Sequence, residues 1–313
     1  MSMNRKGTVP KVDGCARLYG TVRAPASKSY THRAVMVASL AGKCRVVNPL
    51  DCDDTRGTTA MWKKLGARIR KDRAGLVVEG CRGRLRLVRG GTVAVGESGT
   101  LLRFILSILP LTMGTVVVNG RGSLLTRTNR QVVDVLRSWG VDIKGRGPEH
   151  TLPIRIRANG ILPGGAARVD GSVTSQVVSS LLIAAPFARR NTMLELTGPL
   201  VSRPYVDITI DVLKKAGIAV KRDGDRVFRV RSGQTMRPRG DLVVHGDWSG
   251  AAFLLAAAAL TESDVTVTDL VDDCQGDRRI VWILREMGAK VERTCDRVRI
   301  RGPAPLRGVD IDG

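Results

Sequence analysis

The 313-residue chain is long enough for two domains and a sizeable core, and its 43% hydrophobic residues exclude a disordered chain. No uncharged apolar run reaches the roughly 18 residues of a membrane span, which excludes a membrane-spanning protein. The formal net charge of +22 favours a polyanionic partner or small anionic substrates, while only 4% aromatic residues argue against a base-stacking platform for nucleic acid.

The N-terminal stretch MSMNRKGTVPKVDG is basic but has no apolar core, so we expect no signal peptide and a cytoplasmic protein. The chain has six cysteines, with no CxxC pair, and only three histidines. The cysteines are Cys15, Cys44, Cys52, Cys81, Cys274 and Cys295. We expect reduced thiols, and neither a zinc site nor a disulfide framework.

Four segments at similar intervals open with hydroxyl or small residues and continue as an apolar helix. They are SKSYTHRAVMVASLAG, SGTLLRFILSILPL, TSQVVSSLLIAAP and SGAAFLLAAAAL, beginning at Ser27, Ser98, Thr174 and Ser249. The steps between these positions are 71, 76 and 75 residues. Because the segments are apolar nearly all round, they predict helices that are buried on all sides.

A second, amphipathic helix is predicted after each of these, as in VDVLRSWG and ITIDVLKKAG. Each one runs into a glycine: Gly66, Gly140, Gly217 and Gly288. Glycine after a run of good helix formers is typical of the position that follows a helix C-cap. A β-branched strand follows each glycine, so each repeat reads as strand, helix, strand, helix and two strands.

This pattern predicts an α/β protein with buried central helices and sheets outside, whereas an ordinary doubly wound sheet has its helices outside. Basic and apolar residues alternate at 82–91 and 225–233, which predicts half-buried strands with solvated basic faces. No GxGxxG or GxxxxGK[ST] motif marks a nucleotide-binding fold.

Hydroxyl, small and cationic residues gather at the starts of the apolar helices. They are Lys28, Ser29 and Arg33 at the first, Ser98, Gly99, Thr100 and Arg103 at the second, and Thr174, Ser175 and Gln176 at the third. One hydroxyl at a helix start is usually only a cap. Free N–H groups and a partial positive charge at several such ends around one cleft would bind an anion, so the recurrence predicts a shared phosphate site.

Arg33 and Arg103 each lie about one turn inside an apolar helix. A cation at such a place is costly unless it is paired. A ligand phosphate or carboxylate is one possible partner, and a buried carboxylate from Asp53 or Asp54 is the other.

Five segments, taken together, resemble the 5-enolpyruvylshikimate-3-phosphate synthase family in order and spacing. They are PASKSYTHRA, GESGTLLRF, VDGSVTSQVVSSLL, LVSRPYVDITIDVL and HGDWSGAAFLLAAAAL. The resemblance covers the chain from about residue 14 to 313 and implies repeated βαβαββ units in an inside-out α/β barrel-like fold of two domains. The first domain would span residues 21–235, and residues 1–20 and 236–313 would form part of the second.

The resemblance implies transfer of the enolpyruvyl group of phosphoenolpyruvate to the 5-hydroxyl of shikimate 3-phosphate, in aromatic amino-acid biosynthesis, with no metal or organic cofactor and a monomeric state. Lys28 would contact both substrates and move protons, and Gly99 and Arg127 would lie near phosphoenolpyruvate. The residues implied for shikimate 3-phosphate are Lys28, Ser29, Arg33, Thr174, Ser175, Gln176, Ser202 and Tyr205.

Some positions depart from the family pattern. Thr128 follows Arg127 where the family has proline, and Glu97 stands where many members have asparagine. Asp54 matches an acidic position near the cleft, and Asp247 is expected to be structural, while Thr100 and Arg103 are further candidates.

The chain shows four repeats where the family has six, and it ends where the family continues to further catalytic residues. We therefore expect an incomplete second domain, binding of shikimate 3-phosphate at reduced affinity, and little turnover by this chain alone. A non-catalytic shikimate 3-phosphate-binding protein and a basic nucleic-acid-binding protein are the alternative functions.

Overall fold

The computed structural model describes residues 17–86 and 91–311, so Cys15 and the first part of the expected segment 1–20 lie outside the described residues. The chain divides into two compact units. The larger unit comprises Pro25–Asp247 and Asp273–Gly276. The smaller comprises the described residues of Met1–Ala24, Trp248–Asp272 and Asp277–Gly313.

The described residues form four four-stranded sheets, and all four share one topology. In each, a first strand pairs in parallel with a second, the second pairs antiparallel with the fourth, and the third pairs with the fourth at the opposite edge. In sheet order, the larger unit has β13 (Leu242–Val243), β2 (Lys43–Val47), β4 (Gly75–Glu79) and β3 (Arg68–Lys71); β5 (Gly91–Ala94), β6 (Met113–Asn119), β8 (Thr151–Asn159) and β7 (Asp142–Arg146); and β9 (Ala166–Asp170), β10 (Thr192–Thr197), β12 (Val227–Val230) and β11 (Val220–Asp223). The smaller unit has β1 (Arg17–Arg23), β14 (Glu262–Thr268), β16 (Arg297–Gly302) and β15 (Lys290–Arg293).

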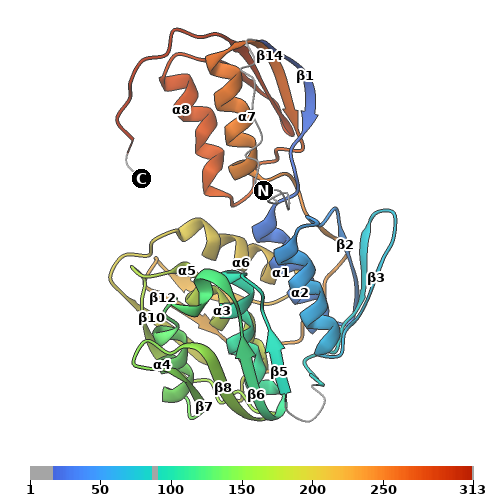
Figure 1. The fold of residues 1–313 in the computed structure, drawn as a ribbon, viewed down its shortest axis with the longest axis vertical. Helices are drawn as coiled ribbons and strands as arrows, with labels where there is room; N and C mark the ends of the chain where they lie inside the picture. The colour runs from blue at the N-terminus through green and yellow to red at the C-terminus, as the bar shows by residue number, and fades with distance from the viewer. Residues whose placement is uncertain (1–16, 87–90, 312–313) are drawn as a thin grey trace. The chain divides into compact units, whose positions relative to one another are not determined.

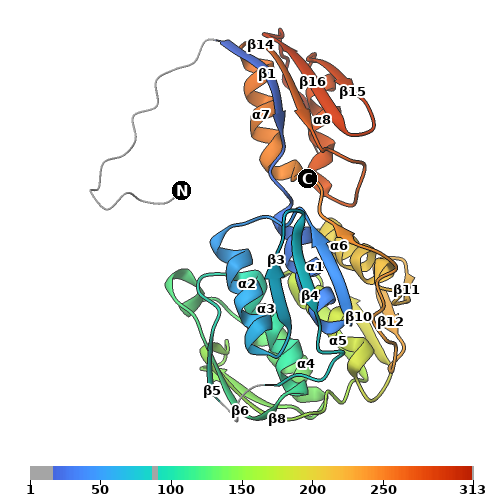
Figure 2. The same cartoon turned by 90° about the vertical axis from the view of Figure 1, so that its right-hand side faces the viewer.

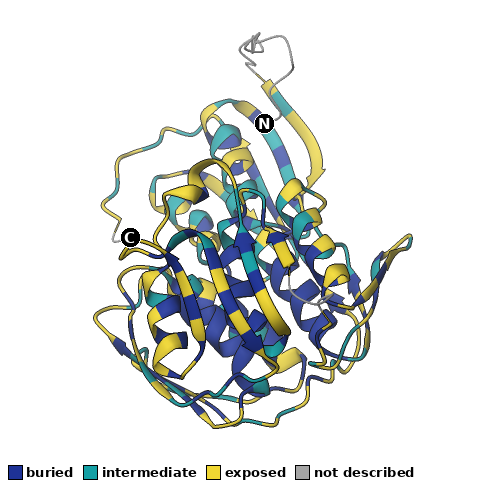
Figure 3. Cartoon of the chain, turned by 60° about the horizontal axis from the view of Figure 1, so that its bottom comes forward, coloured by how far each residue is buried: buried dark blue, intermediate teal, exposed yellow. Residues whose placement is uncertain are grey.

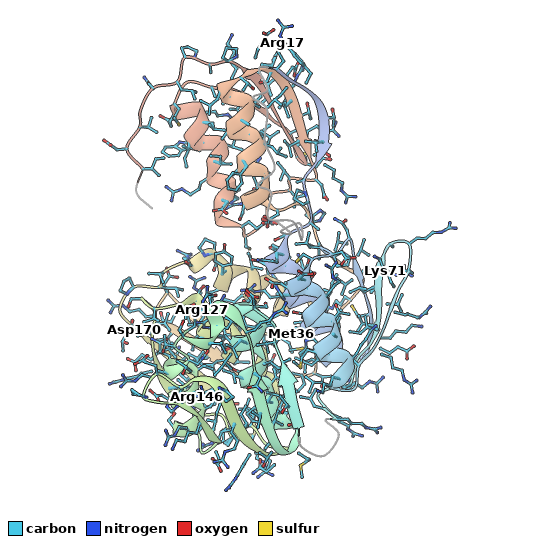
Figure 4. All side chains as sticks on the ribbon, viewed as in Figure 1. Arg17, Met36, Lys71, Arg127, Arg146 and Asp170 are labelled. Atoms are coloured by element: carbon cyan, nitrogen blue, oxygen red, sulfur yellow. The ribbon has the colours of Figure 1, made fainter. Side chains whose placement is uncertain are left out.

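Three inner helices form the centre of the larger unit, with the sheets outside them (Figure 2). They are α1 (Lys28–Leu40), α3 (Gly99–Ile108) and α5 (Ser175–Ala184). Each is capped by the side chain of the preceding residue, Ser27, Ser98 or Thr174, which accepts a hydrogen bond from a backbone N–H of the first turn. Figure 3 shows their buried surface, and Met36 on α1 is labelled in Figure 4. The predicted starts of these helices are confirmed.

A second set of helices ends as the glycine pattern predicts. These are α2 (Asp53–Lys64), α4 (Arg130–Ser138), α6 (Arg203–Lys215) and α8 (Ile280–Glu286). Gly66, Gly140, Gly217 and Gly288 each follow the C-cap and have φ of +106°, +92°, +78° and +104°. Short 3-10 turns lie at Leu109–Leu111, Gly122–Leu125, Ala185–Phe187 and Gly276–Arg279.

The units divide at other residues than the expected 20/21 and 235/236, because two strands are exchanged between repeats. β1 continues to Arg23 beside β14 in the smaller unit. β13, which comes late in the chain, pairs with β2 of the first repeat and so belongs to the larger unit.

Two further expectations are wrong. The fourth apolar helix, α7 (Trp248–Leu260), is not buried on all sides, since Phe253 is 81% exposed and Leu260 67% exposed. Among the described residues its unit has one sheet, which can cover only part of the helix. The strand predicted from the alternation at 225–233 is present as β12, but residues 82–86 form a turn and irregular structure, and Gly83 has a φ of +72°.

Gly80 lies against the C-terminal turn of α1, and its substitution tests that packing. A Cβ there would lie 2.4 Å from the carbonyl oxygen of Ala38 and 2.5 Å from that of Ala41. We expect Gly80→Ala to lower the free energy of unfolding by about 2 kcal/mol, because backbone must shift to admit the methyl group. Gly240→Ala is the control, because a Cβ at Gly240 meets no atom within 4 Å. Equal denaturation midpoints for the two variants would contradict this packing.

Candidate active site

The first turn of α1 presents a lysine next to a carboxylate. Lys28 Nζ donates a hydrogen bond to Asp54 Oδ2 on α2 at 3.3 Å, and the lysine side chain is about half exposed. A cation that keeps half of its surface in solvent and has one carboxylate partner remains able to bind an anionic ligand.

Arg33 lies one turn deeper on α1 and is only 2% exposed. Its Nε donates to Thr209 Oγ1 on α6 at 2.7 Å, and its Nη2 donates to the carbonyl oxygen of Tyr205 at 3.0 Å. Nη2 also lies 3.4 Å from Ser179 Oγ on α5, and the guanidinium carbon lies 5.0 Å from the ring centre of Phe104 on α3. This one side chain therefore contacts α3, α5 and α6 from α1.

The partners of Arg33 are neutral, which differs from one of the two sequence-based alternatives. Asp54 pairs with Lys28 and Asp53 pairs with Arg56, so neither of them supplies a buried carboxylate to Arg33. Burial lowers the pKa of Arg33 to about 10, which still leaves it charged at neutral pH. Ser29 contributes its carbonyl oxygen, which accepts from Nη1 of Arg33 at 2.9 Å.

A second group of polar residues joins the starts of α3 and α5. Arg103 Nη1 donates to Gln176 Oε1 at 3.0 Å, and Gln176 Nε2 donates to Thr100 Oγ1 at 3.3 Å. Burial and the nearby charge of Arg127 both lower the pKa of Arg103. Gln176 thus connects the first turns of the two inner helices.

Gly99 allows two guanidinium groups to approach the N-terminal end of α3. A Cβ at Gly99 would lie 3.2 Å from Nη1 of Arg103 and 3.2 Å from Nη1 of Arg127, which is labelled in Figure 4. Within the described parts of the chain, neither arginine forms an ion pair with a carboxylate. Two close cations of this kind would be stabilised by an anion.

Thr128, which stands where the family pattern has proline, takes part in this arrangement through three contacts. Its carbonyl oxygen accepts from Arg103 Nη2 at 3.3 Å. Its hydroxyl accepts from the N–H of Arg130 at 3.2 Å and donates to the carbonyl oxygen of Glu149 at 3.4 Å. Thr128 therefore fixes the start of α4 while it orients Arg103.

The remaining predicted residues lie at different parts of this region. Thr174 caps α5 and, with Arg103 and Thr128, lines a pocket of about 500 Å³. Ser175 is buried in the first turn of α5, and Ser202 precedes α6 with a φ of +54°. Glu97 pairs with Arg121 at 3.4 Å, and Asp247 donates its N–H to the carbonyl oxygen of Pro25, as expected for a structural role.

Sequence reasoning missed Ser179 and Thr209, which complete the surroundings of Arg33. The two hydroxyl groups lie 2.9 Å apart. A signal was present for one of them, because Ser179 and Ser180 are polar residues inside an otherwise apolar helix. Nothing in the sequence indicated Thr209, which lies on α6.

The model for EPSP synthase, 3-phosphoshikimate 1-carboxyvinyltransferase, matches residues 12–312. The chain belongs to the EPSP synthase family. The family's 3-phosphoshikimate 1-carboxyvinyltransferase from Methanococcoides burtonii is 38% identical over 303 residues, which are 96% of this chain and 70% of that protein. The enzyme of the same name from Methanothrix thermoacetophila is 42% identical over 94% of this chain and 68% of that protein.

The fold of the EPSP synthase family is confirmed by solved structures. EPSP synthase from Acinetobacter baumannii superimposes with a TM-score of 0.80 at 26% identity, covering 95% of this chain and 68% of that one. No helix within residues 17–86 and 91–311 is long and apolar enough to span a membrane. The same residues contain no group of three or more His, Cys, Asp or Glu side chains that could hold a metal ion.

Proposed function

We propose that this chain binds shikimate 3-phosphate and phosphoenolpyruvate at the starts of α1, α3, α5 and α6, as a 3-phosphoshikimate 1-carboxyvinyltransferase. The observation that carries the proposal is Arg33, whose side chain contacts all four helices and so places their predicted residues around one region. The relatives carry the name of this activity over nearly the whole length of the chain.

The binding roles follow the positions of the residues. Lys28, Ser29, Arg33 and Tyr205, with the first turn of α5 and Ser202, would hold shikimate 3-phosphate. The start of α3, with Gly99 and Arg127, would hold phosphoenolpyruvate, and Gln176 would connect the two sides through its bonds to Arg103 and Thr100.

The reaction forms a bond between the 5-hydroxyl oxygen of shikimate 3-phosphate and C2 of phosphoenolpyruvate, and breaks the bond from C2 to the phosphate oxygen. A base accepts the hydroxyl proton, and an acid supplies a proton to the methylene carbon before it is removed again. Lys28 is the proposed proton carrier, because its ammonium group is partly exposed and is held by Asp54. A monomeric state and a cytoplasmic location stay predictions.

Lys28→Met tests the binding role. We expect it to raise the Kd for shikimate 3-phosphate about 10- to 100-fold, because a charge-assisted hydrogen bond to an anion is worth about 1.5–3 kcal/mol. The melting temperature should change little, since Lys28 is half exposed. Lys63→Met, in the last turn of α2, is the matched control and should bind like the parent. Calorimetric titration measures both affinities, and equal Kd values for Lys28→Met and the parent would contradict the assignment.

A phosphate-release assay separates the catalytic proposal from the binding-only alternative. Release of phosphate that requires both substrates and is lost in Lys28→Met would support the transferase. Saturable binding of shikimate 3-phosphate without phosphate release would favour the binding-only function instead.

A further inference from the structure

A buried histidine lies directly beneath the Lys28–Asp54 pair. His32 on α1 is 2% exposed, and its Nδ1 lies 2.7 Å from Thr58 Oγ1 on α2. Lys28 and His32 are four residues apart on α1, and Asp54 and Thr58 are four residues apart on α2. Residues at this spacing share one face of a helix, so the two contacts form successive rungs between α1 and α2.

The hydrogen bonds define which nitrogen of His32 is used. Thr58 Oγ1 has one proton, which it donates to the carbonyl oxygen of Asp54 at 3.2 Å. The same oxygen must then accept from His32, so Nδ1 carries the ring proton. The other ring nitrogen, Nε2, is buried and has no hydrogen-bond partner within the described residues.

The two rungs differ in strength. The Lys28–Asp54 rung is partly exposed, and a solvated ion pair gains too little to fix two flexible side chains by itself. The His32–Thr58 rung is buried, where a satisfied hydrogen bond is costly to break. Thr58 also bonds the backbone of Asp54, so the buried rung acts on the residue that holds Lys28.

We propose that His32 is a positioning residue for Lys28, acting through Thr58 and Asp54. Its Nδ1–H holds the first turn of α2 against α1, so that Asp54 Oδ2 keeps the ammonium group of Lys28 in place. The inference rests on the proposed binding role of Lys28, and it extends that role to a residue that is too buried to contact a substrate.

The unused Nε2 gives a sharp substitution test. Asparagine places its amide nitrogen close to the Nδ1 position, whereas glutamine places its amide near Nε2. His32→Asn should keep the Kd for shikimate 3-phosphate within about twofold of the parent, and His32→Gln should raise it about tenfold, a usual size for coupling between neighbouring residues. Thr58→Val should match His32→Gln, and Thr58→Ser should match the parent.

A double variant shows whether His32 acts through Lys28. In the Lys28→Met background, His32→Gln should raise the Kd no further; a further tenfold increase would mean that His32 acts independently and would overturn the proposal. A purely structural role would lower the melting temperatures of the folded variants without changing their Kd, which would also overturn it. If Lys28→Met alone leaves the Kd unchanged, the proposed function fails first. If Lys28→Met weakens binding while His32→Gln does not, only the positioning role fails.

Discussion

Replacing Arg33 by methionine is expected to lower the free energy of unfolding by about 3 kcal/mol. Four acceptors lose their donor at once: the hydroxyls of Thr209 and Ser179 and the carbonyl oxygens of Ser29 and Tyr205. Removing a charge that is buried without a carboxylate offsets part of this loss, which is why the expected value lies below the sum of four hydrogen bonds. Chemical denaturation monitored by circular dichroism measures the change.

Arg137→Met is the matched control for this substitution. Arg137 lies exposed in the last turn of α4 and forms no ion pair within the described residues, so its loss should stay within about 0.5 kcal/mol. An Arg33→Met variant that unfolds at the same denaturant concentration as Arg137→Met would show that the contacts between inner helices at Arg33 contribute nothing to stability.

The stability of the chain is expected to fall as the pH is lowered from about 6.5 to about 4, with His32 as one identifiable cause. Burial lowers the pKa of His32 from 6.5 to about 4, opposed by the carboxylate of Asp54 and assisted by the charges of Arg33 and Lys28. Between these two values the unfolded chain binds a proton that the folded chain does not. The contribution is therefore fully present above pH 6.5 and is lost as the pH falls through about 4. A pKa difference of this size corresponds to about 3 kcal/mol.

Carboxylates also titrate near the lower end of this range, so the comparison with a variant isolates the histidine. In His32→Asn the free energy of unfolding should depend less steeply on pH between 6.5 and 4, by the same amount. Parallel curves of unfolding free energy against pH for the parent and His32→Asn would contradict the assignment of the slope to His32.

The repeats could be predicted from the sequence because they rest on local patterns. A hydroxyl residue before an apolar run caps a helix through its own backbone, as Ser27 and Ser98 do. Glycine after a helix adopts a positive φ that other residues rarely reach, as at Gly66 and Gly217. These signals act within one or two turns, so they are readable without knowledge of the rest of the fold.

The unpredicted features depend on residues that are distant in the sequence. β13 joins β2 across about 200 positions, and Thr209 meets Arg33 across 176. The segment Asp273–Gly276 belongs to the larger unit, with the N–H of Cys274 donating to the hydroxyl of Tyr30 at 3.4 Å. Charge alone predicted a carboxylate for Arg33, because it could not show that hydroxyl and carbonyl groups would surround it.

The fixed position of Arg33 has a consequence for the entropy of ligand binding. A guanidinium group has five N–H donors, and the four contacts of Arg33 leave one of them, on Nη1, uncommitted. The rotamer freedom of a long side chain, worth up to about 2 kcal/mol, is lost here when the chain folds and not when a ligand arrives. An anion that reaches this last donor meets a group that needs no ordering, so binding at Arg33 should carry a smaller entropic penalty than binding at the flexible Lys28.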